Sequence, residues 1–225
     1  MQWALGAAFS LAFGLAALAL KAVDKRGMAA GVCVGTAAYA GFGFSGFALL
    51  ILFVALGSLR WKRGKKRVRR SARHALANGA VGALLGLTAA ALPTPPSALT
   101  AAFAGSFAAA AADTVSGEVG QAWGGCPVLI STFRPVAKGE NGGVTWVGFI
   151  AGAAAAGVMG LTAAALGMNV SFEAVLAGGA AGNIADSLLG ATLERRGLIG
   201  NSAVNFACAG VGAAVSALLS MSMLG

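Results

Sequence analysis

The chain has 225 residues, of which 58% are hydrophobic and only 10% are charged, and its formal net charge is +9. A soluble domain contains about 25% charged residues, so this composition excludes an ordinary soluble enzyme and indicates an integral membrane protein. The three cysteines, Cys33, Cys126 and Cys208, have no CxxC spacing and predict neither a zinc site nor a disulfide framework.

Apolar runs of the length that a helix needs to cross a bilayer recur along the whole chain. They predict an all-α polytopic membrane helical bundle with about eight transmembrane helices, forming a single integral membrane domain over residues 1–225. The expected spans are Gln2–Leu20, Met28–Gly41, Phe44–Leu59, Ala75–Leu92, Ser97–Asp113, Val144–Leu166, Phe172–Leu189 and Ala203–Leu224. The first run has no basic residue before it, so we expect an uncleaved span and not a signal peptide. Residues 41–46 predict a tight turn or a broken helix, which leaves seven spans as the alternative.

The basic residues are expected to lie on one side of this bundle. All sixteen Lys and Arg follow the first, third, fifth or seventh span, and nine of them lie between Arg60 and Arg73. By the positive-inside rule this side is cytoplasmic and both termini lie outside. We expect the run from Arg60 onward to contact anionic lipid head groups.

Two acidic motifs interrupt the apolar runs on the same side. Asp113 is followed by Glu118, and Asp186 is preceded by Asn183 on one helical face. A carboxylate near hydrocarbon is costly unless it meets water, a cation or a metal. If the fifth span ends near Gly117, both of its acids point into one pocket. These hard oxygen ligands predict a Mg²⁺ site at Asp113, Glu118 and Asp186, and structural pairing with the basic loops is the alternative.

The loop before the sixth span has the features of a phosphate site. It combines Arg134 and Lys138 with a glycine pair beside a helix N-terminus. Glycines let backbone N–H groups approach an anion, and the helix N-terminus adds positive partial charge. The predicted phosphate-binding residues are Arg134, Lys138, Asn141, Gly142, Gly143 and Thr145. The loop lacks the GxxxxGK[ST] pattern of a Walker A motif, and an ordinary interfacial loop is the alternative.

More polar residues enter the spans from this side: Arg73, His74, Asn78, Asn201 and Asn205. We expect Arg73 to contact phosphate, and the amides of Asn78, Asn183 and Asn205 to orient it. Asn201 either caps the last span or joins the site. His74 is open to three readings: a general base, a phosphate donor or an interfacial residue.

Together these motifs resemble the transmembrane protein 19 family (domain of unknown function 92), which includes a plant phytyl-phosphate kinase. The resemblance extends from about Gly27 to Leu219. It rests on Asn78-Gly79, Asp113-Thr114 with Glu118 and Gly120, Pro127 with Ile130-Ser131-Thr132, Gly139 with Gly142-Gly143-Val144-Thr145, Asp186-Ser187 through Thr192, and Asn201 with Asn205.

The resemblance implies a membrane kinase that transfers a phosphoryl group from a nucleoside triphosphate, CTP in particular, to an isoprenoid or phytyl monophosphate, with Mg²⁺ as cofactor. Asp113, Asp186 and Lys138 would be its catalytic residues. Its partners would be CTP, the isoprenoid phosphate and membrane lipids, with no nucleic acid, and a homodimer is left open.

Two other functions are weighed against this one. A CTP-dependent lipid cytidylyltransferase would release pyrophosphate in place of CDP. A non-enzymatic membrane transporter would carry internal repeats and acids near the bilayer midplane. The family commonly has other residues at His74, Val115 and Glu140, which weakens any transfer of the exact acceptor.

Overall fold

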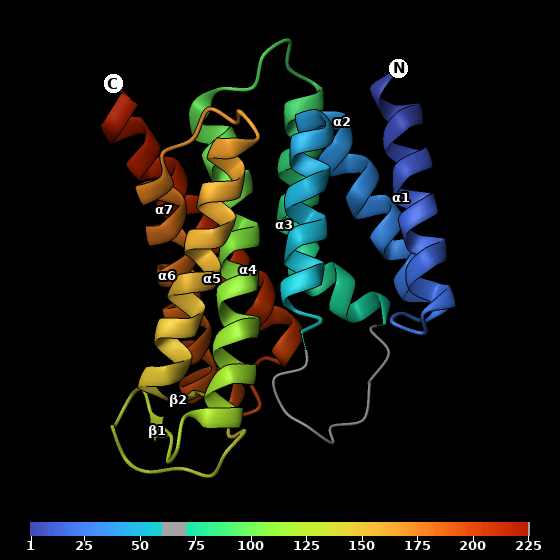
Figure 1. The fold of residues 1–225 in the computed structure, drawn as a ribbon. Helices are drawn as coiled ribbons and strands as arrows, with labels where there is room; N and C mark the ends of the chain where they lie inside the picture. Colours follow the sequence, from blue (N-terminus) through green and yellow to red (C-terminus); the bar gives the residue numbers. More distant parts are fainter. Residues whose placement is uncertain (60–70, 225) are drawn as a thin grey trace.

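The computed structural model describes residues 1–59 and 71–224 and shows the predicted all-α polytopic bundle (Figure 1). Its helices are α1 (Gln2–Ala19), α2 (Lys25–Leu56), α3 (Ala72–Ala90), α4 (Ser97–Trp123), α5 (Trp146–Ala165), α6 (Phe172–Leu189) and α7 (Asn201–Leu224), and a π-helical turn, η1 (Gly190–Glu194), continues α6. Two short strands, β1 (Val128–Leu129) and β2 (Gly143–Val144), pair antiparallel in the loop between α4 and α5.

Helix α2 is broken at Gly43, where φ is 60° and ψ is −152°. This backbone conformation is open to glycine and strained for residues with a side chain. Residues 25–42 run up the bundle against α1 and α3, and the chain reverses at Gly43 to run back toward α4 (Figure 1). The returning segment packs on α4 through Phe53 and Phe107, whose ring centroids are 6.0 Å apart. The eight-span prediction therefore fits the described residues, with the second and third spans meeting at Gly43.

Successive passes alternate in direction, so the connections gather at the two ends of the bundle (Figure 1). Both termini and the 91–96 and 166–171 links lie at the upper end, while the 20–24 turn, the loop 124–145 and residues 195–200 lie at the lower end. Every described Lys and Arg belongs to a lower-end connection or to the helical turn beside it. The other eight basic residues, within 60–70, lie outside the described residues, so their predicted lipid contacts stay a prediction.

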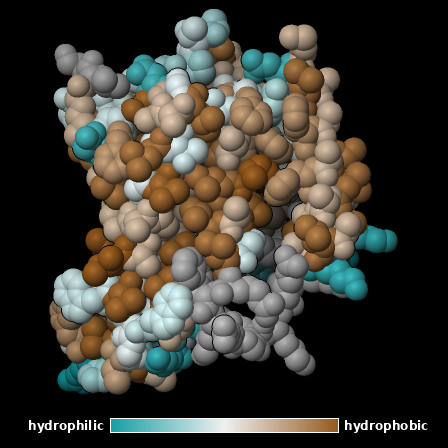
Figure 2. All heavy atoms as spheres, in the orientation of Figure 1, coloured by the Kyte–Doolittle hydropathy of each residue, from teal (hydrophilic) through white to brown (hydrophobic). Residues whose placement is uncertain are grey.

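The surface of the bundle is apolar across its middle and hydrophilic toward its two ends, as Figure 2 shows for one face. Helices α1, α2, α4, α5 and α7 are each long and apolar enough to cross a membrane. Of the remaining described α-helices, α6 carries Asn183 and Asp186, and α3 carries His74 and Asn78. Polar side chains enter the bundle from these two helices and also from the apolar helices α4, through Asp113, and α7, through Asn205.

Helix α4 is the centre of the bundle and packs against α2, α3, α5, α6 and α7. Phe103, Phe107 and the alanines at 108–112 are all buried. Small residues on its neighbours allow this close approach: a Cβ on Gly152 would lie 2.8 Å from the Ala112 carbonyl oxygen, a distance at which something must shift. Tight packing holds the polar residues of α4 at a defined depth and rotation.

Candidate functional site

A pocket of about 170 Å³ opens at the lower end of the bundle, between α4, α6, η1 and the loop 124–145. Residues from two separate regions of the sequence, 113–145 and 183–201, line it. The lining residues are Asp113, Ser116, Gly117, Gly120 and Gln121 of α4; Pro127 and residues 138–145 of the loop; Asn183, Asp186, Ser187, Gly190 and Glu194 of α6 and η1; and Asn201 of α7. Polar and charged groups therefore converge at one end of an apolar bundle.

The wall formed by α4 is a single helical face that begins at Asp113. Its lining residues follow at i+3, i+4, i+7 and i+8, the spacing of neighbours on one side of a helix. The expected end of the fifth span at Asp113 is wrong, because α4 continues to Trp123. Asp113 consequently lies about 15 Å along the axis from the lower end of α4, at a rise of about 1.5 Å per residue.

The opposite wall repeats this pattern on α6 and η1. Asn183, Asp186, Ser187, Gly190 and Glu194 succeed one another at i, i+3, i+4, i+7 and i+11. The π-helical turn carries this face past the end of α6 to Glu194. Single π-turns occur frequently at functional sites, because the extra residue changes the direction of the side chains that follow.

Asp113 and Asp186 meet across the pocket, and their carboxyl groups are within hydrogen-bonding reach of each other. Such a pair needs a proton on one carboxyl group or, when both are ionised, a cation beside them. The Oδ2 atom of Asp186 is buried and accepts no hydrogen bond from the described residues. A buried oxygen without a donor is costly, and a metal ion would satisfy it. Two aspartates with the buried amide of Asn183 one turn away therefore fit the hard ligands that Mg²⁺ prefers.

The loop 124–145 closes the pocket from below, and backbone hydrogen bonds define its shape. Val128 pairs with Val144 and Leu129 with Gly143. Gly142 has a φ of 75°, and a Cβ at this residue would overlap Ala191 of η1. The loop thus rests directly on η1, which brings residues 139–143 and the Lys138 side chain to the pocket.

The N-terminus of α5 borders the same pocket. Thr145 caps this helix, since its hydroxyl oxygen accepts a hydrogen bond of 3.1 Å from the Gly148 N–H. The positive end of the α5 dipole adds to the charge of Lys138, so this wall favours an anion. An ion pair between Arg195 and Glu140 (3.6 Å) connects the loop to the residues after η1, and both side chains are exposed enough for the pair to contribute little stability.

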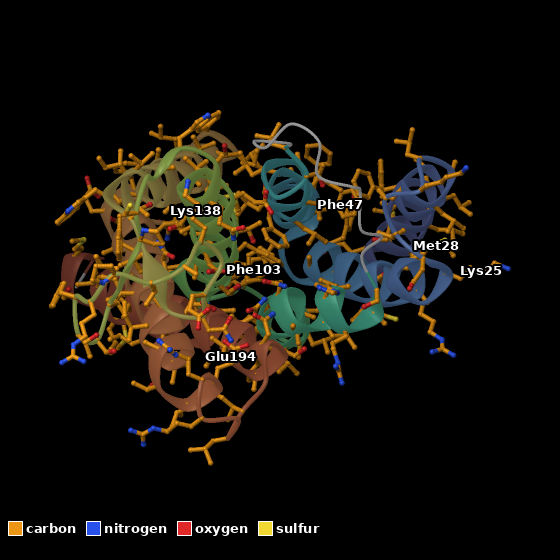
Figure 3. The ribbon with its side chains drawn as sticks, turned by 90° about the horizontal axis from the view of Figure 1, so that it is seen from below. Lys25, Met28, Phe47, Phe103, Lys138 and Glu194 are labelled. Atoms are coloured by element: carbon orange, nitrogen blue, oxygen red, sulfur yellow. The ribbon has the colours of Figure 1, made fainter. Side chains whose placement is uncertain are left out.

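The structure brings most of the predicted site residues together. Nine line the pocket: Asp113, Lys138, Asn141, Gly142, Gly143, Thr145, Asn183, Asp186 and Asn201. Five do not: Arg73, Asn78, Glu118, Arg134 and Asn205. Figure 3, a view from below, shows Lys138 and Glu194 on the α4–α7 side of the molecule and Lys25 at the opposite edge, on the α1–α2 side.

Glu118 does not join the two aspartates. Five residues of continuous helix separate it from Asp113, which is about 140° of rotation about the axis. The prediction depended on a helix end near Gly117, and that condition is not met. Within residues 1–59 and 71–224, no group of three or more Asp, Glu, His or Cys side chains is placed to hold a metal ion. A cation in this pocket would therefore be held by two aspartates, amide or hydroxyl oxygens and the substrate.

Asn78 and Asn205 contact each other and not the pocket. The Asn205 Nδ2 donates to the Asn78 Oδ1 at 3.3 Å, and the Asn78 Nδ2 donates to the His74 carbonyl oxygen at 3.0 Å. This polar contact joins α3 to α7. It gives both amides a structural partner, as expected for amides inside apolar passes.

Arg73 and Arg134 are both exposed at the lower end and lie outside the pocket lining. Arg134 takes part in the loop fold through its carbonyl oxygen, which accepts a 2.9 Å hydrogen bond from the Leu129 N–H.

Four polar residues of the helical walls line the pocket but were not among the predicted site residues: Ser116, Gln121, Ser187 and Glu194. Each continues the helical face of a predicted site residue, Asp113 on α4 or Asn183 on α6, so following these two faces toward the lower end is the signal that finds them. Glu194 adds a further carboxylate near the aspartate pair, and partial burial raises its pKa.

The chain is similar to proteins of several organisms. The family model described as integral membrane protein DUF92 matches residues 8–213. An uncharacterized membrane protein, MJ0933 of Methanocaldococcus jannaschii, is 35% identical over 192 residues, covering 79% of this chain and 77% of that protein. Protein VTE6, chloroplastic, of Arabidopsis thaliana is 27% identical over 227 residues, covering 92% of this chain and 68% of that protein.

A second uncharacterized membrane protein, sll0875 of Synechocystis, is 30% identical over 181 residues, covering 72% of this chain and 69% of that protein. No solved structure matches the chain significantly. The extent of the family match and the identity to the archaeal relative together mean that the chain belongs to the DUF92 family of integral membrane proteins.

Proposed function

We propose that this chain is a membrane phosphotransferase that transfers a phosphoryl group from a nucleoside triphosphate, CTP by the family resemblance, to an isoprenoid or phytyl monophosphate. The observation that carries the proposal is the meeting of Asp113 and Asp186, with a buried Oδ2 that lacks a donor among the described residues, in a pocket that also contains Lys138. A polar pocket at one end of an apolar bundle suits a substrate with a phosphate head and a lipid tail.

The chemistry of the lining residues supports phosphoryl transfer. This reaction needs little covalent help from a protein and depends on positioning and on neutralising charge. Lys138, the backbone N–H groups near Gly142 and Gly143 and the N-terminus of α5 would bind phosphate oxygens. Asp113 and Asp186 would hold Mg²⁺, which when bound supplies further positive charge to the phosphates.

The reaction is balanced without any group beyond the two substrates. An oxygen of the acceptor monophosphate forms a bond to the γ-phosphorus of CTP, and the bond from that phosphorus to the β–γ bridging oxygen breaks. CDP and the isoprenoid diphosphate are the products. Asn141 and Asn201 line the pocket and would orient the phosphates by hydrogen bonding.

A transfer assay tests the proposal. Purified protein in lipid nanodiscs is incubated with Mg²⁺, γ-labelled CTP and prenyl monophosphates of several chain lengths, and the lipid product is identified. We expect labelled diphosphate from the wild type. Asp113→Asn and Asp186→Asn should each lower the rate by about 10²-fold or more, the usual effect of losing one preorganised electrostatic group.

Glu118→Gln is the matched control, since it neutralises a carboxylate of the same helix outside the pocket, and we expect it to retain most of the activity. Label that enters the lipid from α-labelled CTP, with release of pyrophosphate, would identify a cytidylyltransferase instead. If no acceptor gains label from γ-labelled or α-labelled CTP, the proposal of an enzyme is wrong and a non-enzymatic transporter is the remaining hypothesis.

A further inference from the structure

The loop 124–145 contains a tight hairpin that exposes an aromatic residue. The Leu129 N–H donates to the Arg134 carbonyl oxygen at 2.9 Å, and the Phe133 N–H donates back to the Leu129 carbonyl oxygen at 2.8 Å. We call the residues between these two partners, 130–133, the hairpin tip. Phe133 is 77% exposed, among the most exposed large apolar side chains described.

The backbone of Phe133 is in the left-handed region, with a φ of 55°. Glycine or asparagine adopts this conformation most readily, and a bulky aromatic residue there is strained. The ring gains little from the rest of the chain, because most of it is uncovered. A strained and uncovered aromatic ring is best explained by a partner outside the chain that covers it.

The surroundings of the tip indicate that this partner is the lipid bilayer. Trp123 is the last residue of α4 and Trp146 the first of α5, and they are 59% and 85% exposed. Tryptophans gather where membrane-crossing helices meet the water interface. Arg134 next to the tip, together with Arg196, presents exposed cations that complement anionic head groups.

We propose that the hairpin tip inserts Phe133 into the head-group region of the leaflet in which α4 ends and α5 begins. The tip would form one interfacial surface with Trp123 and Trp146. Insertion covers the exposed ring and compensates for the strained backbone that presents it.

The insertion would also set the depth of the pocket. The Ile130 N–H donates to the Gly142 carbonyl oxygen at 3.0 Å, so a backbone hydrogen bond connects the tip to the pocket wall. The pocket would then open at head-group level, where the phosphate of a membrane lipid lies. This last consequence rests on the proposed function, whereas the insertion of Phe133 does not.

Depth-dependent fluorescence quenching tests the insertion. A Phe133→Cys variant is labelled with an environment-sensitive dye in nanodiscs, in a background in which the exposed Cys33 and Cys126 are serine and the buried Cys208 is kept. We expect about twofold or more quenching by lipids carrying a spin label near the head group, and weak quenching by aqueous iodide, as for other interfacial side chains.

Asn141→Cys is the matched control on the same loop, since Asn141 is exposed and lines the pocket. Its dye should be quenched more strongly by iodide and less strongly by spin-labelled lipid than the dye at residue 133. Phe133→Trp keeps an aromatic ring at the tip, and brominated lipids should quench its additional emission relative to the wild type. Iodide quenching at residue 133 equal to that at residue 141, with no effect of either labelled lipid, would overturn the proposal whether or not the protein is a kinase.

Discussion

Asp113 and Asp186 form a contact between two carboxyl groups that is unfavourable when both are ionised and no cation is near. Functional sites often retain such unfavourable arrangements because the ligand resolves them. At the scale of the residue, the pair therefore links cation binding to the stability of the folded chain.

We predict that Asp113→Asn leaves the thermal stability without Mg²⁺ unchanged or raises it, because the substitution removes like-charge repulsion. The variant should also lose the stabilisation that Mg²⁺ gives the wild type, which is about 2.7 kcal/mol at a cation concentration one hundred times the Kd. Thermal unfolding in detergent with and without Mg²⁺ measures both effects. A Mg²⁺ effect equal to that of the wild type would contradict this assignment of the ligands, and Glu118→Gln should keep the wild-type response.

At the scale of the element, the site depends on where helices end and how the loop packs on them. Helix α4 continues past Asp113 and turns Glu118 away from the pocket, while η1 continues the polar face of α6 to Glu194. Asn78 and Asn205 contact each other between α3 and α7, in place of the phosphate. The rotation of side chains around the helix axis thus separates Asp113 from Glu118, although the two residues are close in the sequence.

The contact of the loop with η1 gives a prediction for Gly142. Gly142→Ala should lower the free energy of unfolding by about 2 kcal/mol or more, because a strained positive φ adds to a steric overlap with Ala191. Gly125 also has a positive φ, of 69°, but a Cβ there would meet nothing within 4 Å.

Gly125→Ala is therefore the control for the backbone strain alone, with an expected cost of about 1 kcal/mol. Denaturant titration of the purified variants compares the two. Equal losses would mean that the loop does not depend on its contact with η1, and substrate binding should then also be equally affected in both variants.

At the scale of the whole molecule, the alternation of eight passes places both termini at one end of the bundle and the pocket at the other (Figure 1). We propose that the pocket end is cytoplasmic, because the described basic residues gather there.

This orientation predicts the labelling of Cys126, an exposed residue of the loop 124–145. A membrane-impermeant maleimide should label Cys126 in inside-out vesicles and not in intact cells. Thr94→Cys, in the link at the upper end and in a chain in which Cys126 is serine, should show the reverse pattern. Labelling of Cys126 in intact cells would reverse the proposed orientation.

The sequence by itself determined the class of the protein, the approximate number of its helices and the two aspartates of its candidate site. These features follow from local rules: the length that crosses a bilayer, the one-sided placement of Lys and Arg, and the high cost of a carboxylate such as Asp113 or Asp186 in an apolar run. Only the tertiary structure decided which polar side chains meet in the pocket. Glu118 lies outside the pocket and Glu194 lines it. The physical reason is that the end of α4 and the packing of the loop on η1 depend on contacts between segments that are distant in the chain.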